Sequence, residues 1–339
     1  MDNAIEESDT LAQDGDTIRP PIESPNDSFN TSKENTRISS SHTSTPLTPE
    51  LISKSVSLIS RTGDGLSYAY SRLDIHNTGV TSLDTLETYP HLRYIDCSDN
   101  QLVDISTLAK LEFLLSVNVS NNKLRNIPEG LDKKRYLQHV NLSKNHLQEF
   151  CITSWPIASW INLNDNSLIE LTLQSFPELV HLEVRGNKLS TMLTCNTPKL
   201  QRLYLAANGI SALNALEGKP CLQLLHLRGN SIQSLEWING VSLPSLTYLN
   251  LRANKISTFD QIDPLKDLTA LRILVLAENP IDQNETYRLE IISRLPKLDK
   301  LDKKLITIEE REEAATVSLS SLNIKYTIDN LTKEWTDGI

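Results

Sequence analysis

The side chains that could do chemistry in this sequence are histidines, serines and a few acids. Imidazole is a common ligand of zinc. Four of the seven histidines are candidates for that role, namely His76, His139, His181 and His226. Ser143, His139 and Asp96 supply the three residue types of a serine-hydrolase triad. Whether any of these side chains act together depends on the elements that position them.

A repeated pattern dominates the region 67–281. The motif L-x-x-L-x-L-x-x-N-x-L occurs ten times at intervals of about 22 residues, a leucine-rich-repeat period. Thr78 stands at the asparagine position of the first copy. The other nine copies have asparagine there, at Asn100, Asn122, Asn145, Asn166, Asn187, Asn208, Asn230, Asn254 and Asn279. The sequence therefore predicts an α/β leucine-rich-repeat solenoid (horseshoe) of about ten repeats, with a parallel β-sheet on its concave face.

The recurring asparagine has a structural explanation. Each repeat must turn after a short strand, and the turn is buried between neighbouring repeats. Its backbone N–H and C=O groups therefore need partners. An asparagine side chain offers two donors and one acceptor oxygen. We expect the nine asparagines to form a ladder that satisfies the turns of adjacent repeats.

The predicted sheet keeps the candidate chemical groups apart. Neighbouring strands lie about 4.8 Å apart, and the four histidines fall on repeats 1, 4, 6 and 8, so roughly 10–15 Å separates them. That spacing excludes a common zinc site and favours solvated surface histidines. Nothing orients the triad residues, and no nucleophile elbow or Gly-rich phosphate loop is present. The sequence predicts a protein that is not an enzyme and has no cofactor or metal.

The ends of the repeat region need caps. The stretch "PELISKSVSLISRT" (49–62) has helical apolar spacing, which predicts a helix that begins at the N-cap Thr48. In "TIEE", Thr307 and Glu310 form a predicted capping box that opens another helix. The predicted domains are a disordered tail (1–46), an N-terminal capping helix (47–66), the repeats (67–281), a C-terminal cap and helix (282–320) and a C-terminal tail (321–339).

Charge and composition exclude several classes of partner and location. The tail 1–46 is rich in Ser and Thr and has nine acidic residues against three basic ones. The net charge of −10 argues against nonspecific binding to nucleic acid or anionic lipid. We expect no membrane span, because no run of about 18 apolar residues exists. We also expect no secretory signal, because the stretch "MDNAIEESDT" is acidic and lacks an apolar h-region. The four cysteines form no C-x-x-C pair, which fits a reducing compartment.

The concave face is the candidate site for protein binding. Its N-terminal strands carry acids and amides, at Asp74, Asp96, Asn118, Asn141 and Asn162. Its later strands carry arginines, and aromatic residues are interspersed; exposed residues of these two kinds are typical of binding hot spots. The predicted protein-binding residues are Tyr94, Trp160, Arg185, Arg202, Tyr204, Arg228 and Tyr248.

Four segments carry a resemblance to a known family. They are "PLTPELISKSVSLISRTGDGLSYAYSRLDI" (46–75), "HLRYIDCSDNQLVDISTLAKL" (91–111), "LRILVLAENPIDQNETYR" (271–288) and "LDKLD" (298–302). Together they resemble the leucine-rich repeat-containing protein 23 family, components of axonemal radial spokes in motile cilia and sperm flagella. The resemblance covers about 46–315 and implies no catalytic residues.

The resemblance also implies a location and partners. It places the protein in the cytoplasm, at the cytoskeleton, in the axoneme of a cilium or flagellum. There it implies a structural role in assembling and stabilising a radial spoke, near the spoke head, and so in ciliary or sperm motility. The implied partners are other radial spoke subunits and neighbouring axonemal proteins. An alternative role is a soluble regulatory subunit of a Ser/Thr protein phosphatase, which short repeats with an aromatic and acidic concave face also suit.

Overall fold

The computed structural model describes residues 45–62, 65–191, 195–213 and 216–316. The described residues all belong to one compact unit. The predicted acidic tail up to residue 44 and the predicted tail 321–339 therefore lie outside the described residues. The predicted tail also includes Thr45 and Pro46, but these two residues contact the first repeat: Thr45 O accepts from Thr81 N at 2.9 Å, and Pro46 forms a parallel β-bridge with Ser82.

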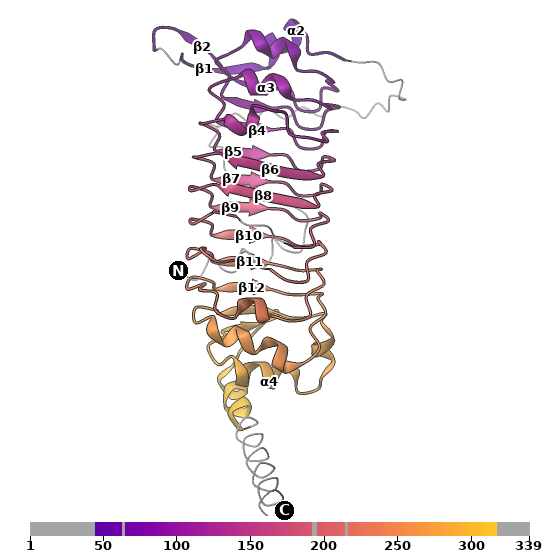
Figure 1. Cartoon of the computed structure of the whole chain (residues 1–339), viewed down its shortest axis with the longest axis vertical. Helices are drawn as coiled ribbons and strands as arrows, with labels where there is room; N and C mark the ends of the chain where they lie inside the picture. The colour runs from indigo at the N-terminus through magenta and orange to yellow at the C-terminus, as the bar shows by residue number, and fades with distance from the viewer. Residues whose placement is uncertain (1–44, 63–64, 192–194, 214–215, 317–339) are drawn as a thin grey trace, which may run out of the picture. The chain divides into compact units, whose positions relative to one another are not determined.

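The repeats form one continuous sheet of 13 strands in the described part of the chain. Its ten repeat strands are parallel and in register, and they follow one another along the stack in Figure 1. They are β2 (Tyr68–Asp74), β3 (Tyr94–Asp96), β4 (Ser116–Asn118), β5 (His139–Asn141), β7 (Trp160–Asn162), β9 (His181–Glu183), β10 (Arg202–Tyr204), β11 (Leu224–His226), β12 (Tyr248–Asn250) and β13 (Ile273–Val275). The predicted leucine-rich-repeat solenoid with a parallel sheet is confirmed.

The core lies behind this sheet because side chains alternate along each strand. In the sixth repeat, the inward residues Leu182, Val184 and Leu189 are all fully buried. The return halves of the repeats are short and irregular. They contain η1 (Asp84–Thr88), α3 (Ser106–Lys110), η2 (Leu131–Lys133), η3 (Glu236–Ile238), η4 (Phe259–Asp267), η5 (Pro280–Gln283) and a second, two-stranded sheet of β6 (Glu149–Ser154) and β8 (Glu170–Ser175).

The asparagine side chains bond the turn of their own repeat to the one before it. Asn187 Nδ2 donates to Leu163 O of the preceding repeat at 3.0 Å and to Val184 O of its own repeat at 3.3 Å. Its Oδ1 accepts from Leu168 N at 3.0 Å. The other eight asparagines at this position have the same three kinds of partner. Each side chain therefore fills the hydrogen-bonding needs of two neighbouring turns.

The residue before each of these positions has a left-handed backbone. Its φ is positive in all ten repeats, for example 53° at Asn121, 55° at Lys144 and 51° at Ala207. Only Gly186 and Gly229 supply this conformation without steric cost. For other residues it costs about 1–2 kcal/mol, and the adjacent asparagine bonds offset that cost.

The N-terminal cap differs from the predicted helix. A helix does begin after Thr48, whose Oγ1 accepts from Leu51 N, but α2 (Pro49–Ser55) ends at Ser55. The prediction of a helix over 49–62 is wrong from Val56 onward. There β1 (Val56–Arg61) pairs antiparallel with β2. The stretch contains β-branched residues and can bond along the whole length of β2, and this pairing outweighs its helical apolar spacing.

The C-terminal cap contains a helix and a small hairpin. Helix α4 (Tyr287–Arg294) is followed by β14 (Lys300–Leu301), which pairs parallel with β13, and by β15 (Lys304–Leu305), which pairs antiparallel with β14. The predicted capping box is confirmed, because Thr307 N donates to Glu310 Oε2 at 3.0 Å and Glu310 N donates to Thr307 Oγ1 at 3.3 Å. Residues 308–316 are helical.

Candidate protein-binding surface

Two outward columns run along the concave face of the sheet. The first column is Arg72, Tyr94, Ser116, His139, Trp160, His181, Arg202, Leu224, Tyr248 and Ile273. The second column is Asp74, Asp96, Asn118, Asn141, Asn162, Glu183, Tyr204, His226, Asn250 and Val275. Successive members of a column are direct partners on adjacent strands, so each column is a line of neighbouring side chains.

In the first five repeats, the second-column side chains accept hydrogen bonds from the backbone of their own turn. Asp96 Oδ1 accepts from Ser98 N at 3.0 Å and from Ser98 Oγ at 2.6 Å. Asn118 and Asn141 bond Ser120 and Ser143 in the same way. Asp74 and Asn162 accept the equivalent N–H bonds in their repeats. These are Asx turns that close the end of each strand. The acids and amides predicted to face a partner are thus largely used within the protein.

In the sixth to eighth repeats, larger side chains replace these turn-forming residues. The aromatic rings of Trp160, His181, Tyr204 and His226 follow one another across β7, β9, β10 and β11, and we call them the ring row. Their centroids are 6.4, 5.2 and 5.9 Å apart in that order, and the last two pairs are stacked. The ring row steps from the first column to the second between His181 and Tyr204. Columns read singly from the sequence did not reveal this diagonal.

The sequence predicts that the two histidines of the ring row are solvated surface residues, and this prediction is wrong. The His181 side chain is only 16% exposed, and its Nε2 lies 3.0 Å from Glu183 Oε1. His226 Nε2 lies 3.0 Å from Asn250 Nδ2. Burial first, and then the nearby cations of Arg185 and Arg228, lower the pKa of His226 to about 4. His226 is therefore neutral near pH 7 and serves as an aromatic surface.

Cations border the ring row. Arg185 and Arg202 are exposed, and Arg228 is half-buried. Within the described part of the chain, none of these three guanidiniums forms an ion pair with a carboxylate, whereas Arg252 pairs with Glu278. Aromatic area beside unneutralised arginine is the composition of interface hot spots. The ring row and its three arginines form the candidate surface.

Two of the predicted binding residues lie apart from this surface. Tyr94 is exposed but belongs to β3, three strands and about 14 Å away from Trp160 on β7. Tyr248 is only 8% exposed and packs with Ile273, Val275 and Leu224. The structure therefore groups Trp160 and Tyr204 with the three arginines but separates the other two tyrosines from them.

The other candidate chemical groups do not converge. Ser143 Oγ donates to Asn141, and the Asp96 carboxylate is held by Ser98 and Asn118, so no triad forms around His139. Burial lowers the pKa of His139. Among the described residues, no group of three His, Cys, Asp or Glu side chains is arranged to hold a metal ion. The helices in the same residues are too short or too polar to cross a membrane.

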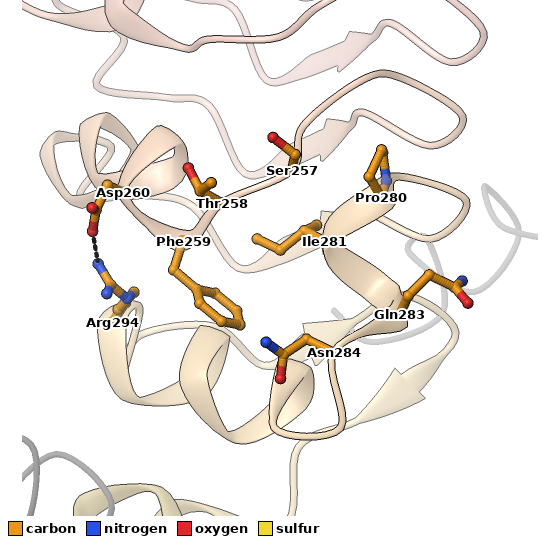
Figure 2. Close-up of a pocket in the computed structure, with 9 residues that line it drawn as sticks. All are labelled: Ser257, Thr258, Phe259, Asp260, Pro280, Ile281, Gln283, Asn284 and Arg294. Carbon is orange, nitrogen blue, oxygen red and sulfur yellow. Dashed lines mark hydrogen bonds and ion pairs between the residues drawn. The ribbon is translucent and has the colours of Figure 1, made fainter.

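A hollow of about 510 Å³ lies near the C-terminal cap (Figure 2). The guanidinium of Arg294 sits 5.7 Å from the centre of the Phe259 ring. Arg294 Nη1 also contacts Asp263 at 2.8 Å and Asp260 at 3.4 Å. Among the residues that line this hollow, Arg294 is therefore already neutralised, and its contacts tie η4 of the repeat region to α4 of the cap.

Comparisons with known proteins agree with this architecture. A family model described as "Leucine-rich repeat" matches residues 178–325. The functional domain of InlJ from Listeria monocytogenes superimposes with a TM-score of 0.56 at 24% identity, over 68% of this chain and 48% of that chain. This similarity concerns the fold alone.

Sequence relatives are more specific. Human leucine-rich repeat-containing protein 23 (Homo sapiens) is 36% identical over 276 residues, which cover 80% of this chain and 80% of that protein. The Xenopus tropicalis protein of the same name is 37% identical over 313 residues, covering 80% and 77%. Cilia- and flagella-associated protein 410 of Mus musculus is 39% identical over 97 residues, covering 28% and 38%. The chain belongs to the leucine-rich repeat-containing protein 23 family.

Proposed function

We propose that the protein is a structural, protein-binding component of the axoneme of motile cilia or flagella, which helps assemble and stabilise a radial spoke near its head. In this role it supports ciliary or sperm motility by docking rather than by catalysis. Membership of the leucine-rich repeat-containing protein 23 family supports this proposal, as does the similarity of one segment to a cilia- and flagella-associated protein.

The ring row is the observation that carries the binding role. Its rings are held in place by strand pairing, by stacking and by the asparagine bonds of the turns beneath them. A surface that is rigid before a partner arrives loses little conformational entropy on binding. The unneutralised Arg185, Arg202 and Arg228 favour a partner segment that presents carboxylates. The proposed partners are other radial spoke subunits and neighbouring axonemal proteins.

The test is the location of the tagged full-length protein in a ciliated cell. We expect the tag along the axoneme, and we expect the protein to stay with demembranated flagella until high salt or denaturant releases it. A diffuse cytoplasmic signal, with the protein in the soluble extract, would contradict the axonemal role. Release together with a Ser/Thr phosphatase, also in non-ciliated cells, would favour the alternative of a phosphatase regulatory subunit.

A further inference from the structure

Exposed apolar side chains are concentrated at the N-terminal end of the sheet. Six of the eleven large hydrophobic residues that are exposed in the described part of the chain belong to β1, β2, their connection or the adjacent β3. They are Leu58, Ile59, Leu66, Tyr68, Tyr70 and Tyr94. An exposed apolar cluster of this kind marks an interaction site in a soluble domain.

Strand register brings four of these side chains to one face. Ile59 pairs with Tyr70, and Tyr68 and Tyr70 alternate with the core-facing residues of β2. Arg72, two residues further along β2, pairs with Tyr94. Because directly paired residues share a face, Ile59, Tyr68, Tyr70 and Tyr94 lie together on the concave face. We call these four residues the hairpin patch.

Arginines surround the hairpin patch without acidic partners. The Arg61 guanidinium lies 6.0 Å from the centre of the Tyr68 ring. Arg93 Nη2 donates to Arg61 O at 2.7 Å, and Arg72 lies beside Tyr94. Within the described residues, none of these three guanidiniums contacts a carboxylate. The electrostatic complement of the patch is therefore acidic.

The hairpin also ends the sheet. Strand β1 is the first in the strand order, and in the described part of the chain no strand pairs with its outer edge (Figure 1). The neighbouring helix α2 buries Ile52 against the core and so covers the end of the core below the sheet. An open strand edge beside an apolar surface is the arrangement that accepts an added strand from another chain.

We propose that the hairpin patch is a second docking surface, where an extended segment of a partner protein adds as a strand to β1. That segment carries apolar and acidic residues on the same face, because Arg61 and Arg72 share the face of Tyr68 and Tyr94. Its apolar side chains would cover Ile59, Tyr68 and Tyr70, and its carboxylates would meet the arginines beside them. A second copy of this chain fits less well, because edge-to-edge pairing would bring two sets of unneutralised arginines together.

A peptide experiment on the full-length protein tests the chemistry. The probe is an eight-residue peptide with Tyr and Glu in turn at its odd positions and Thr at its even positions, so that Tyr and Glu share one face of the extended peptide. Binding is followed by fluorescence anisotropy. We expect this peptide to bind at least about tenfold more tightly than the same peptide with Lys in place of Glu. The double variant Tyr68→Thr, Tyr70→Thr keeps strand-forming residues and should weaken binding at least about fivefold. The proposal would be overturned if the protein bound the Glu and Lys peptides equally tightly. It would also be overturned if the tyrosine variant bound the Glu peptide as tightly as the unchanged protein, or if no binding were seen.

The matched control is Tyr136→Thr, which removes another exposed tyrosine at a distant site and should leave peptide binding unchanged. Unchanged thermal unfolding of the hairpin variant shows that its loss is not misfolding. Sedimentation of the full-length protein tests whether a second copy of this chain occupies the hairpin patch. We expect a monomer, and a dimer that the hairpin variant abolishes would assign the patch to self-association and overturn the proposal.

Discussion

All repeats of the concave face share the same asparagine-bonded turn, but they differ in the second-column residue at the end of the strand. In the second to fourth repeats, Asp96, Asn118 and Asn141 bond their own turns, and Asn118 Nδ2 also donates to Asp96, so little hydrogen-bonding capacity faces a partner. In the sixth to eighth repeats, Glu183, Tyr204 and His226 occupy the same position. Their side chains face outward, and the two aromatic ones extend the ring row. The second-column residue therefore separates repeats whose strand end is closed by an Asx turn from repeats that add a ring or an acid to the outward face, while Trp160 and His181 join the ring row from the first column.

The largest expected effect concerns the buried imidazole of the ring row. His226 has a pKa of about 4 in the folded protein, below the value of about 6.5 expected when unfolded. The unfolded chain therefore binds the proton first as pH falls. Stability is full above pH 6.5 and is lost as pH falls from about 6.5 to 4, by up to about 3 kcal/mol. Urea unfolding at several pH values measures this loss.

The variant His226→Phe isolates the contribution of that one ring. It keeps an aromatic side chain beside Tyr204 but cannot titrate, so the fall in stability between pH 6.5 and 4 should shrink by about the same amount. His146→Gln, at an exposed histidine outside the two columns, is the matched control for the loss of an imidazole. An identical pH profile for His226→Phe would show that the ring row is hydrated.

The second prediction concerns the framework that both kinds of repeat share. Asn122→Ala and Asn187→Ala each leave buried turn groups without partners, so each should lower the free energy of unfolding by about 1–3 kcal/mol. Equal losses in chemical denaturation would show that the asparagine bonds do not depend on what the concave face carries. Asn121→Ala, at an exposed residue beside Asn122, should cost less.

The third prediction concerns partner binding by the ring row. Tyr204→Ala or Trp160→Ala should weaken binding of a radial spoke partner by about 1 kcal/mol or more, because each removes aromatic contact area. Tyr204→Phe keeps the ring and should retain most of the affinity. Pull-down with titrated partner measures the change. Full affinity in both alanine variants would move the binding site away from the ring row, to the caps.

The smallest effect is expected at the polar strand ends. Asn118→Ala removes the side chain that bonds Ser120 and Asp96, at a half-buried position. It should lower stability by about 0.5–1.5 kcal/mol and leave partner binding unchanged. Thermal unfolding and the same pull-down measure the two quantities. A binding loss as large as that of Tyr204→Ala would show that second-column residues such as Asn118 and Tyr204 contribute alike to partner binding.

Much of the fold could be predicted from the sequence because its signals are local and repeated. The leucine spacing and the recurring asparagine fix strand, turn and period together, and "TIEE" contains both halves of its capping box. The N-terminal hairpin could not be predicted in the same way. Val56–Arg61 has helical apolar spacing, and only pairing with β2, a non-local interaction, turns it into a strand.

The candidate surface was partly predictable for a related reason. Residue type identified Trp160, Tyr204 and the arginines beside them. It did not identify His181 and His226, whose role depends on stacking across adjacent strands. One signal was available: an Asp or Asn in the second column closes the turn by accepting from the backbone N–H two residues later, as Asp96 and Asn250 do. Glu183, Tyr204 and His226 stand at that position without forming this bond to their own turn.

The asparagine bonds have a mechanical consequence. Each of these side chains reaches its own repeat and the one before it, and none reaches further. A pulling force applied at one end would therefore meet a series of similar small resistances, one coil at a time, instead of a single large barrier. A protein built this way would unfold repeat by repeat, and a partner bound across several repeats would oppose that unfolding.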